Sequence, residues 1–179
     1  RDKTVEFIGY DNTEATVENI KYRKVNQKQK EFYQLVFNVT PFYPEGGGQV
    51  GDTGSIESNG EKTSIFDTKK ENNLIIHLAD KLPVDPRAQF TAKINVTKRN
   101  LSASNHSATH LLHHALRTVL GKHVEQKGSL VNANNLRFDF SHFSKVTDEE
   151  IQKIETLVTK AIRDNIQLDE KRNTPIEEA

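Results

Sequence analysis

Cysteine, methionine and tryptophan are absent from the 179 residues of this chain. Because no disulfide can form, a reducing compartment is expected, and we predict a cytoplasmic location. The same absence restricts any metal site built from these residues alone to His, Asp and Glu ligands. The chain starts at Arg1 rather than at a methionine, which indicates that it is part of a longer protein.

The chain also lacks an excess of one charge and any long apolar run. Its 25 basic and 25 acidic residues cancel, so RNA binding would need a local patch or another part of a larger protein. The mean hydropathy is −0.70, and no stretch approaches the roughly 18 apolar residues that span a bilayer. We therefore expect one domain of ordinary size, or one with a small subdomain attached, and no membrane partner.

The first half is rich in Val, Ile, Phe and Tyr with partial alternation, which predicts strands. A loop at 41–54 interrupts them, because its five glycines and two prolines exclude regular structure over most of its length. We predict a β-rich, barrel-like subdomain at 1–96. The expected strands are 5–8, 15–25, 31–39, 54–57, 62–68, 74–78 and 88–96, with a hairpin turn at 26–30.

The hydrophobic period becomes helical from Thr97 to Leu120, and Gly121 stands at the expected C-cap. Short β-like pieces follow, of which Leu136–Phe140 alternates most clearly. Thr147 to Glu150 forms a capping box before an apolar stripe with helical spacing, which predicts a second helix. Residues 97–179 are therefore expected to form an α+β core, with both helices on a mainly antiparallel sheet.

His106 and His110 lie four residues apart on the first predicted helix, with His113 on the same face. Two imidazoles one turn apart can reach a single metal ion. Zinc needs further ligands, since structural sites use four and catalytic sites about three. A solvated polar face that contains histidines stays open as the alternative. The opposite face carries Leu111, Leu112, Ala115, Leu116 and Val119.

The run Gly46-Gly47-Gly48 can bring backbone N–H groups close to a phosphate or a developing oxyanion, because no Cβ intervenes. It fits neither the Walker pattern nor the dinucleotide fingerprint, and a merely flexible loop is the alternative. Gln49 and Asp52 can add polar contacts, although Asp52 can equally cap a turn.

Three basic residues are candidates for contacts with a substrate. Lys98 and Arg99 precede the histidines and can contact phosphate, although such a charge pair is more often simply solvated. Arg137 lies on the polar face of the strand that carries Phe138 and Phe140.

Taken together, these segments resemble the editing domain of alanyl-tRNA synthetases and the related free-standing alanyl editing proteins. The resemblance covers essentially the whole chain, and the order of the segments makes it specific. The segments are FYPEGGGQVGDTG at 42–54, NHSATHLL at 105–112, QKGSL at 126–130 and RFDF at 137–140.

The resemblance implies hydrolysis of the ester that joins a wrong amino acid, serine or glycine, to the 3′ end of tRNA-Ala. Water would attack the ester carbonyl. Gly47, Gly48 and Gln49 would form part of the pocket, and Gln126 matches a family position associated with editing. The partners implied are mischarged tRNA-Ala and the rest of a synthetase chain, an ATP-dependent alanine–tRNA ligase. The residues predicted to bind the substrate or its tRNA are Lys98, Arg99, Asp52 and Arg137.

The resemblance also implies a Zn²⁺ cofactor, held by His106 and His110 together with a Cys and a His from a C-x3-H motif further along. The chain reaches Ala179 without that motif, and we interpret this as truncation before it. Gly46 stands where the family commonly has Ser.

Three alternative functions stay open. A threonyl-type editing domain shares the H-x3-H helix, although the long strand region and the Gly-Gly-Gln loop argue against it. A free-standing trans-editing protein is the second alternative. The third is a non-catalytic module that holds the tRNA acceptor end.

Overall fold

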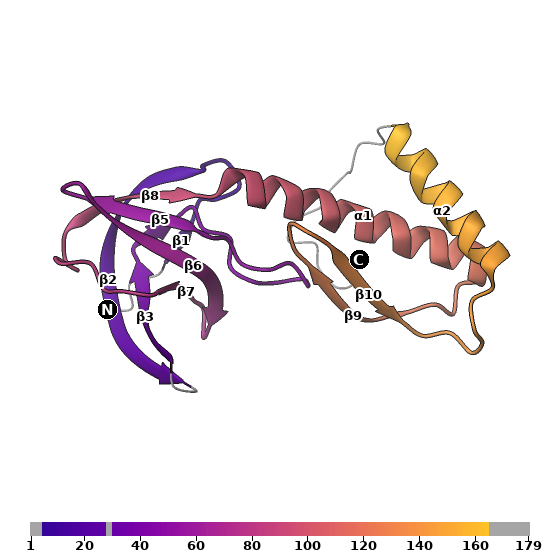
Figure 1. Ribbon diagram of the computed structural model, residues 1–179, viewed down its shortest axis with the longest axis horizontal. Helices are drawn as coiled ribbons and strands as arrows, with labels where there is room; N and C mark the ends of the chain where they lie inside the picture. The colour runs from indigo at the N-terminus through magenta and orange to yellow at the C-terminus, as the bar shows by residue number, and fades with distance from the viewer. Residues whose placement is uncertain (1–4, 28–29, 165–179) are drawn as a thin grey trace.

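The computed structural model describes residues 5–27 and 30–164. It has two parts arranged along its long axis, a β-barrel and an α+β unit (Figure 1). The predicted α+β class with a barrel-like first part is confirmed. Residues 28 and 29 of the predicted turn, and residues 165–179 of the predicted core, lie outside the described residues.

Six strands form a closed barrel in the order β2-β3-β7-β6-β5-β8. Every neighbouring pair is antiparallel, and β8 closes the ring by pairing with β2. Closure leaves no free edge in this sheet, which protects it from pairing with other chains. The strands are β2 Glu14–Gln27, β3 Lys30–Phe37, β5 Gly54–Ser58, β6 Glu61–Glu71, β7 Leu74–Ala79 and β8 Gln89–Ile94. Outside the ring, β1 (Glu6–Phe7) pairs in parallel with β4 (Val39–Thr40).

Alternation along the strands fills the barrel with apolar side chains. Leu35 and Phe37 of β3 belong to this main core, whereas Val36 between them packs in a separate small cluster with Ile76 and Leu78. Successive side chains of β3 are therefore buried on opposite faces of the strand. The main core consists of Val17, Leu35, Phe37, Phe42, Ile56, Ile65, Ala79, Phe90, Ala92 and Ile94.

A fully buried histidine fixes the start of the 41–54 loop. Nδ1 of His77 lies 3.1 Å from the Leu35 carbonyl oxygen and Nε2 lies 2.7 Å from Thr40 Oγ1. Because the Leu35 carbonyl only accepts, Nδ1 carries the proton, and in the neutral ring Nε2 accepts from the Thr40 hydroxyl. Thr40 Oγ1 in turn accepts from the backbone N–H of Phe42 at 3.1 Å. Burial lowers the pKa of His77 from 6.5 to about 4, because the charged form would lose its hydration.

The second part is built on the long helix α1 (Val96–Leu120), which starts one residue before the predicted Thr97. Asn95 caps its N-terminus and Gly121, with φ 119°, its C-terminus. The hairpin of β9 (Gln126–Val131) and β10 (Leu136–Phe140) runs beside it (Figure 1).

Helix α2 (Asp148–Arg163) starts at the predicted capping box, in which Thr147 and Glu150 bond reciprocally. It packs with α1 and the hairpin around a second core formed by Leu112, Ala115, Leu116, Val124, Phe138, Phe140, Ile154 and Val158. Neither helix of the described part is both long enough and apolar enough to cross a membrane.

Candidate active site

The histidine face of α1 points toward the hairpin and the tip of the glycine loop. The rings of His106 and His110 have centroids 4.9 Å apart. One turn further, the ring of His113 lies 5.2 Å from that of Phe138 on β10. Thr109 completes the face, because positions i, i+3, i+4 and i+7 of a helix lie on one side.

The tip of the 41–54 loop is a tight turn that needs two glycines. The backbones of Gly46 and Gln49 bond each other in both directions, at 3.1 and 3.0 Å. Between them, Gly47 and Gly48 have φ of +57° and +81°, as in a type I′ turn, where both central residues are left-handed. The sequence predicted a loop here, and the structure adds that its tip has a defined conformation.

This turn extends from the barrel and hydrogen-bonds to the hairpin of β9 and β10. The N–H of Val131 donates to the Gly48 carbonyl at 2.7 Å, and the N–H of Val50 donates to the Val131 carbonyl at 2.9 Å. A Cβ on Gly47 would lie 3.8 Å from Cε1 of His106, and one on Gly48 would lie 2.9 Å from the Ser129 side chain. The loop thus brings bare backbone against both the histidine helix and the hairpin.

A small pocket of about 30 Å³ lies where these three segments meet. Such a volume holds one or two water molecules or an ion, so an aminoacyl group has to widen it. All four segments singled out in the sequence contribute to it, since Gly47, His106, His110, Gln126 and Phe138 line it. The remaining lining residues are Thr109, His113, Ser129 and Val131.

A β-bulge brings Gln126 to this pocket. Gly128 pairs with Asp139, but the next pair is Gln126 with Phe140, so Lys127 is an extra residue in β9. Strict alternation would have placed Lys127, not Gln126, on the face of β9 that lines the pocket. The bulge shifts the register by one residue, so that Gln126, an exposed residue, lines the pocket.

Asp52 and Arg99, predicted as tRNA contacts, form a buried ion pair with side chains 6 % and 16 % exposed. Nε of Arg99 donates to Oδ2 of Asp52 at 2.8 Å. The guanidinium also donates to the carbonyls of Gly9 and, at 2.6 Å, Pro41. The Asp52 carboxylate further accepts from the N–H of Tyr43 at 2.8 Å. In this conformation, the pair joins the first turn of α1 to the base of the glycine loop.

The other predicted site residues lie around the pocket without lining it. Lys98 is exposed on the first turn of α1, and Arg137 is exposed on β10, where its Nε lies 3.2 Å from Oδ2 of Asp139. Gln49 is 8 % exposed beneath the turn. Among the described residues, the pocket lining therefore includes neither these three nor Gly48.

The donor set at the pocket fits part of a zinc site. His106 and His110 lie on one face and line the same cavity, and imidazole nitrogen is a preferred zinc ligand. In the described ranges 5–27 and 30–164, no group of three or more His, Cys, Asp or Glu side chains is placed to hold a metal ion. Among the described residues, His106 and His110 would therefore be two of the ligands that a zinc ion needs.

Sequence reasoning did not single out Thr109, Ser129 or Val131, which line the pocket. Thr109 could have been found from helical spacing, because it lies three residues after His106. Ser129 and Val131 could not, since the face of β9 is set by pairing with Gly48 and β10 and the sequence does not reveal either partner.

Residues 1–99 match the family model described as tRNA synthetases class II (A). The chain therefore belongs to this family of class II tRNA synthetases.

The chain is 59 % identical over its whole length to an alanine–tRNA ligase of Parabacteroides distasonis and spans 20 % of that relative. It is 58 % identical, over 99 % of its length, to the alanine–tRNA ligase of Cytophaga hutchinsonii, of which it spans 20 %. A third alanine–tRNA ligase, from Porphyromonas gingivalis, is 54 % identical. The resemblance to alanyl-tRNA synthetases is confirmed, and the chain spans about a fifth of the length of these curated relatives.

Proposed function

We propose that this chain is the editing unit of an alanine–tRNA ligase and hydrolyses the ester of Ser-tRNA-Ala and Gly-tRNA-Ala. The observation that carries the proposal is the meeting of Gly47, His106, His110 and Gln126 in one pocket, from segments up to 79 positions apart in the chain. In this proposal, the whole gene product binds the tRNA and joins alanine to it with ATP. It does so for translation in the cytoplasm.

Each lining residue has a task in such a hydrolysis. The bare backbone at Gly47 admits the ester close to the histidine helix, because no side chain stands there. The carboxamide of Gln126 both donates and accepts hydrogen bonds, so it can orient the attacking water against the carbonyl carbon. The released ribose oxygen takes up a proton from that water as the ester bond breaks.

Selection of serine over alanine requires a polar contact, because a pocket separates side chains that differ by one small group only weakly by size. The hydroxyls of Thr109 and Ser129 line the pocket. The Thr109 hydroxyl donates to the Asn105 carbonyl at 2.8 Å, so its oxygen lone pairs can accept from the serine hydroxyl.

We further propose Zn²⁺ as the cofactor of the whole gene product, held by His106, His110 and ligands from outside the described residues. When bound, the ion would polarise the water or the ester carbonyl. The imidazole nitrogens of His106 and His110 would be two of its ligands.

The test uses the full gene product that contains this chain, incubated with Ser-tRNA-Ala, Gly-tRNA-Ala and Ala-tRNA-Ala. We expect rapid release of serine and glycine, and a loss of at least about 100-fold in kcat/KM for His106→Ala and His110→Ala. His114→Ala is the matched control, because His114 is exposed on the same helix and does not line the pocket. Absence of serine release by the unaltered protein would refute the hydrolase proposal.

A non-catalytic module that holds the acceptor end is the second candidate. It is favoured by one observation, that the described residues supply only two of the ligands zinc needs. Under this alternative, the protein binds Ser-tRNA-Ala and leaves its ester intact, so one assay of binding and hydrolysis separates the two.

A further inference from the structure

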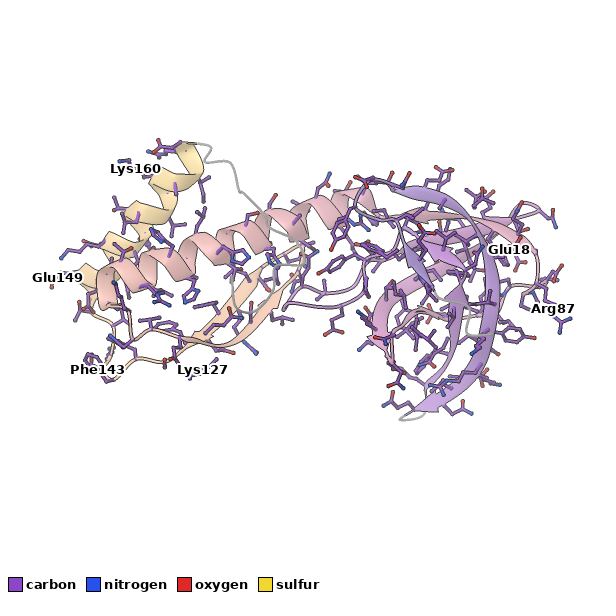
Figure 2. The ribbon with its side chains drawn as sticks, turned by 180° about the vertical axis from the view of Figure 1, so that it is seen from behind. Glu18, Arg87, Lys127, Phe143, Glu149 and Lys160 are labelled. Atoms are coloured by element: carbon purple, nitrogen blue, oxygen red, sulfur yellow. The ribbon has the colours of Figure 1, made fainter. Side chains whose placement is uncertain are left out.

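A second aromatic cluster lies at the end of the hairpin that is farthest from the barrel. It combines His123, from the loop after α1, with His142 and Phe143, from the loop between β10 and α2. Figure 2 shows Phe143 at this outer end, on the same side of the molecule as Lys127. The hairpin connects the cluster to the pocket, because Gln126, which lines the pocket, pairs with Phe140, two residues before His142.

The two imidazoles of this cluster are fixed by a direct hydrogen bond. Nε2 of His123 lies 2.8 Å from Nδ1 of His142, and their ring planes differ by only 19°. Nε2 of His142 lies 3.2 Å from the Ser144 hydroxyl. A Cβ on Gly121 would come within 2.9 Å of Nδ1 of His123, so the glycine C-cap also makes room for this ring.

Phe143 packs on these imidazoles but remains open to solvent. Its ring centroid lies 4.7 Å from that of each histidine, while the residue is 83 % exposed. Exposed aromatic side chains on a supported platform stack on the bases of single-stranded nucleic acid, whatever the sequence. The exposed Lys122 and Lys145 flank the cluster and can approach phosphates.

We propose that His123, His142 and Phe143 form a stacking platform for one nucleotide in the single-stranded 3′ end of the tRNA. The inference rests on the proposed function, in which the terminal nucleotide enters the pocket. Along α1, His110 and Leu120 are about 15 Å apart at 1.5 Å per residue. With about 3.4 Å per stacked nucleotide, the platform takes a base about four positions from the 3′ terminus.

The test places 2-aminopurine, whose fluorescence falls on stacking, at each of the last six positions of tRNA-Ala, one at a time. With the full gene product and uncharged tRNA, we expect quenching at one internal position. Phe143→Ala and Phe143→Leu should both abolish that quenching and weaken binding by about fivefold or more. Because Phe143 is largely exposed, neither change is expected to unfold the protein, and Leu keeps an apolar side chain without a ring.

Phe66→Ala is the matched control, since Phe66 is a partly exposed aromatic residue, 41 % accessible, on the barrel strand β6. It should leave the quenching unchanged. An equal signal at every position in the unaltered protein and in Phe143→Ala would overturn the platform, as would an effect of Phe143 on self-association in place of RNA binding.

The two proposals can fail separately. Quenching measured with uncharged tRNA needs no hydrolysis, so position-specific stacking without serine release would leave the platform standing and refute the editing function. If Phe143→Ala releases serine with an unchanged KM and loses no quenching, the editing function stands and the platform is refuted.

Discussion

At the scale of single residues, the tip of the glycine loop requires glycine for two separate reasons. Gly48 needs a left-handed backbone, and it also needs space, because a Cβ would lie 2.9 Å from Ser129. Gly60 has nearly the same backbone, with φ +78°, but nothing lies within 4 Å of its notional Cβ. Gly60 therefore serves as a control, because a substitution there causes backbone strain without the steric clash expected at Gly48.

We expect Gly60→Ala to cost about 1 kcal/mol of unfolding free energy, the strain of a left-handed alanine. Gly48→Ala should cost more than this and should also impair hydrolysis, because the turn has to withdraw from Ser129. Urea unfolding of both variants, with deacylation rates, measures the difference. If both variants are equally destabilised and the deacylation rates are unchanged, the hairpin accommodates the Cβ at position 48 and the prediction is wrong.

The buried His77 makes stability depend on pH. Its pKa is about 4 in the folded protein against 6.5 in the unfolded chain, so the unfolded state binds more protons between these values. The free energy of unfolding is therefore not reduced by His77 above pH 6.5. It falls as the pH drops from 6.5 toward 4, by about 3 kcal/mol in all. Urea unfolding at intervals from pH 4.5 to 7.5 measures this slope.

His77→Leu is expected to be less stable at neutral pH, because Thr40 loses its acceptor, but to lack this part of the slope. His114→Ala, which alters an exposed histidine, should retain it. A slope unchanged in His77→Leu would assign the pH dependence to other groups.

Local patterns along the chain predicted several helices and strands well, but they did not predict which strands distant in the sequence pair with each other. Thr147 and Glu150 mark the start of α2 because a capping box is formed within four residues. The closure of β8 on β2 and the pairing of β3 with β7 join distant segments, and no short-range pattern encodes them. The sequence likewise predicted a phosphate contact for Arg99 and polar contacts for Asp52. It did not predict that these two side chains pair with each other, because charge is visible in a sequence and burial is not.

At the scale of elements, the Asp52–Arg99 pair sets the direction in which α1 leaves the barrel. It joins the helix, the glycine loop and the carbonyls of Gly9 and Pro41. Breaking a buried ion pair from one side leaves a desolvated charge, which typically costs about 3 kcal/mol or more.

We therefore predict that Asp52→Asn loses about 3 kcal/mol of unfolding free energy. The matched control is Glu14→Gln, which removes an ion pair with Lys93 at 3.3 Å between side chains 53 % and 55 % exposed. Because solvent screens that pair, its loss should cost less than about 1 kcal/mol. Denaturant unfolding compares the two, and similar losses would contradict a structural role for Asp52.

At the scale of the whole molecule, the barrel and the α+β unit meet at the glycine loop and at the Asp52–Arg99 ion pair, and the pocket lies at this junction. His106 and His110 are the only pocket histidines that the resemblance assigns to zinc. We expect the full gene product to retain about one equivalent of Zn²⁺ more than its His106→Ala/His110→Ala variant, since catalytic sites need about three protein ligands. Metal analysis after gel filtration measures this, with His114→Ala as the control. Equal zinc contents would contradict the assignment.

The turn at Gly46–Gln49 belongs to the barrel by sequence but closes a cavity that the histidine helix needs. Exchange of the barrel and its loop between related genes would therefore place the loop of one parent against the helix and hairpin of the other. Chimaeras between relatives should retain hydrolysis when both parts come from one parent, or when the loop and hairpin are exchanged as a unit.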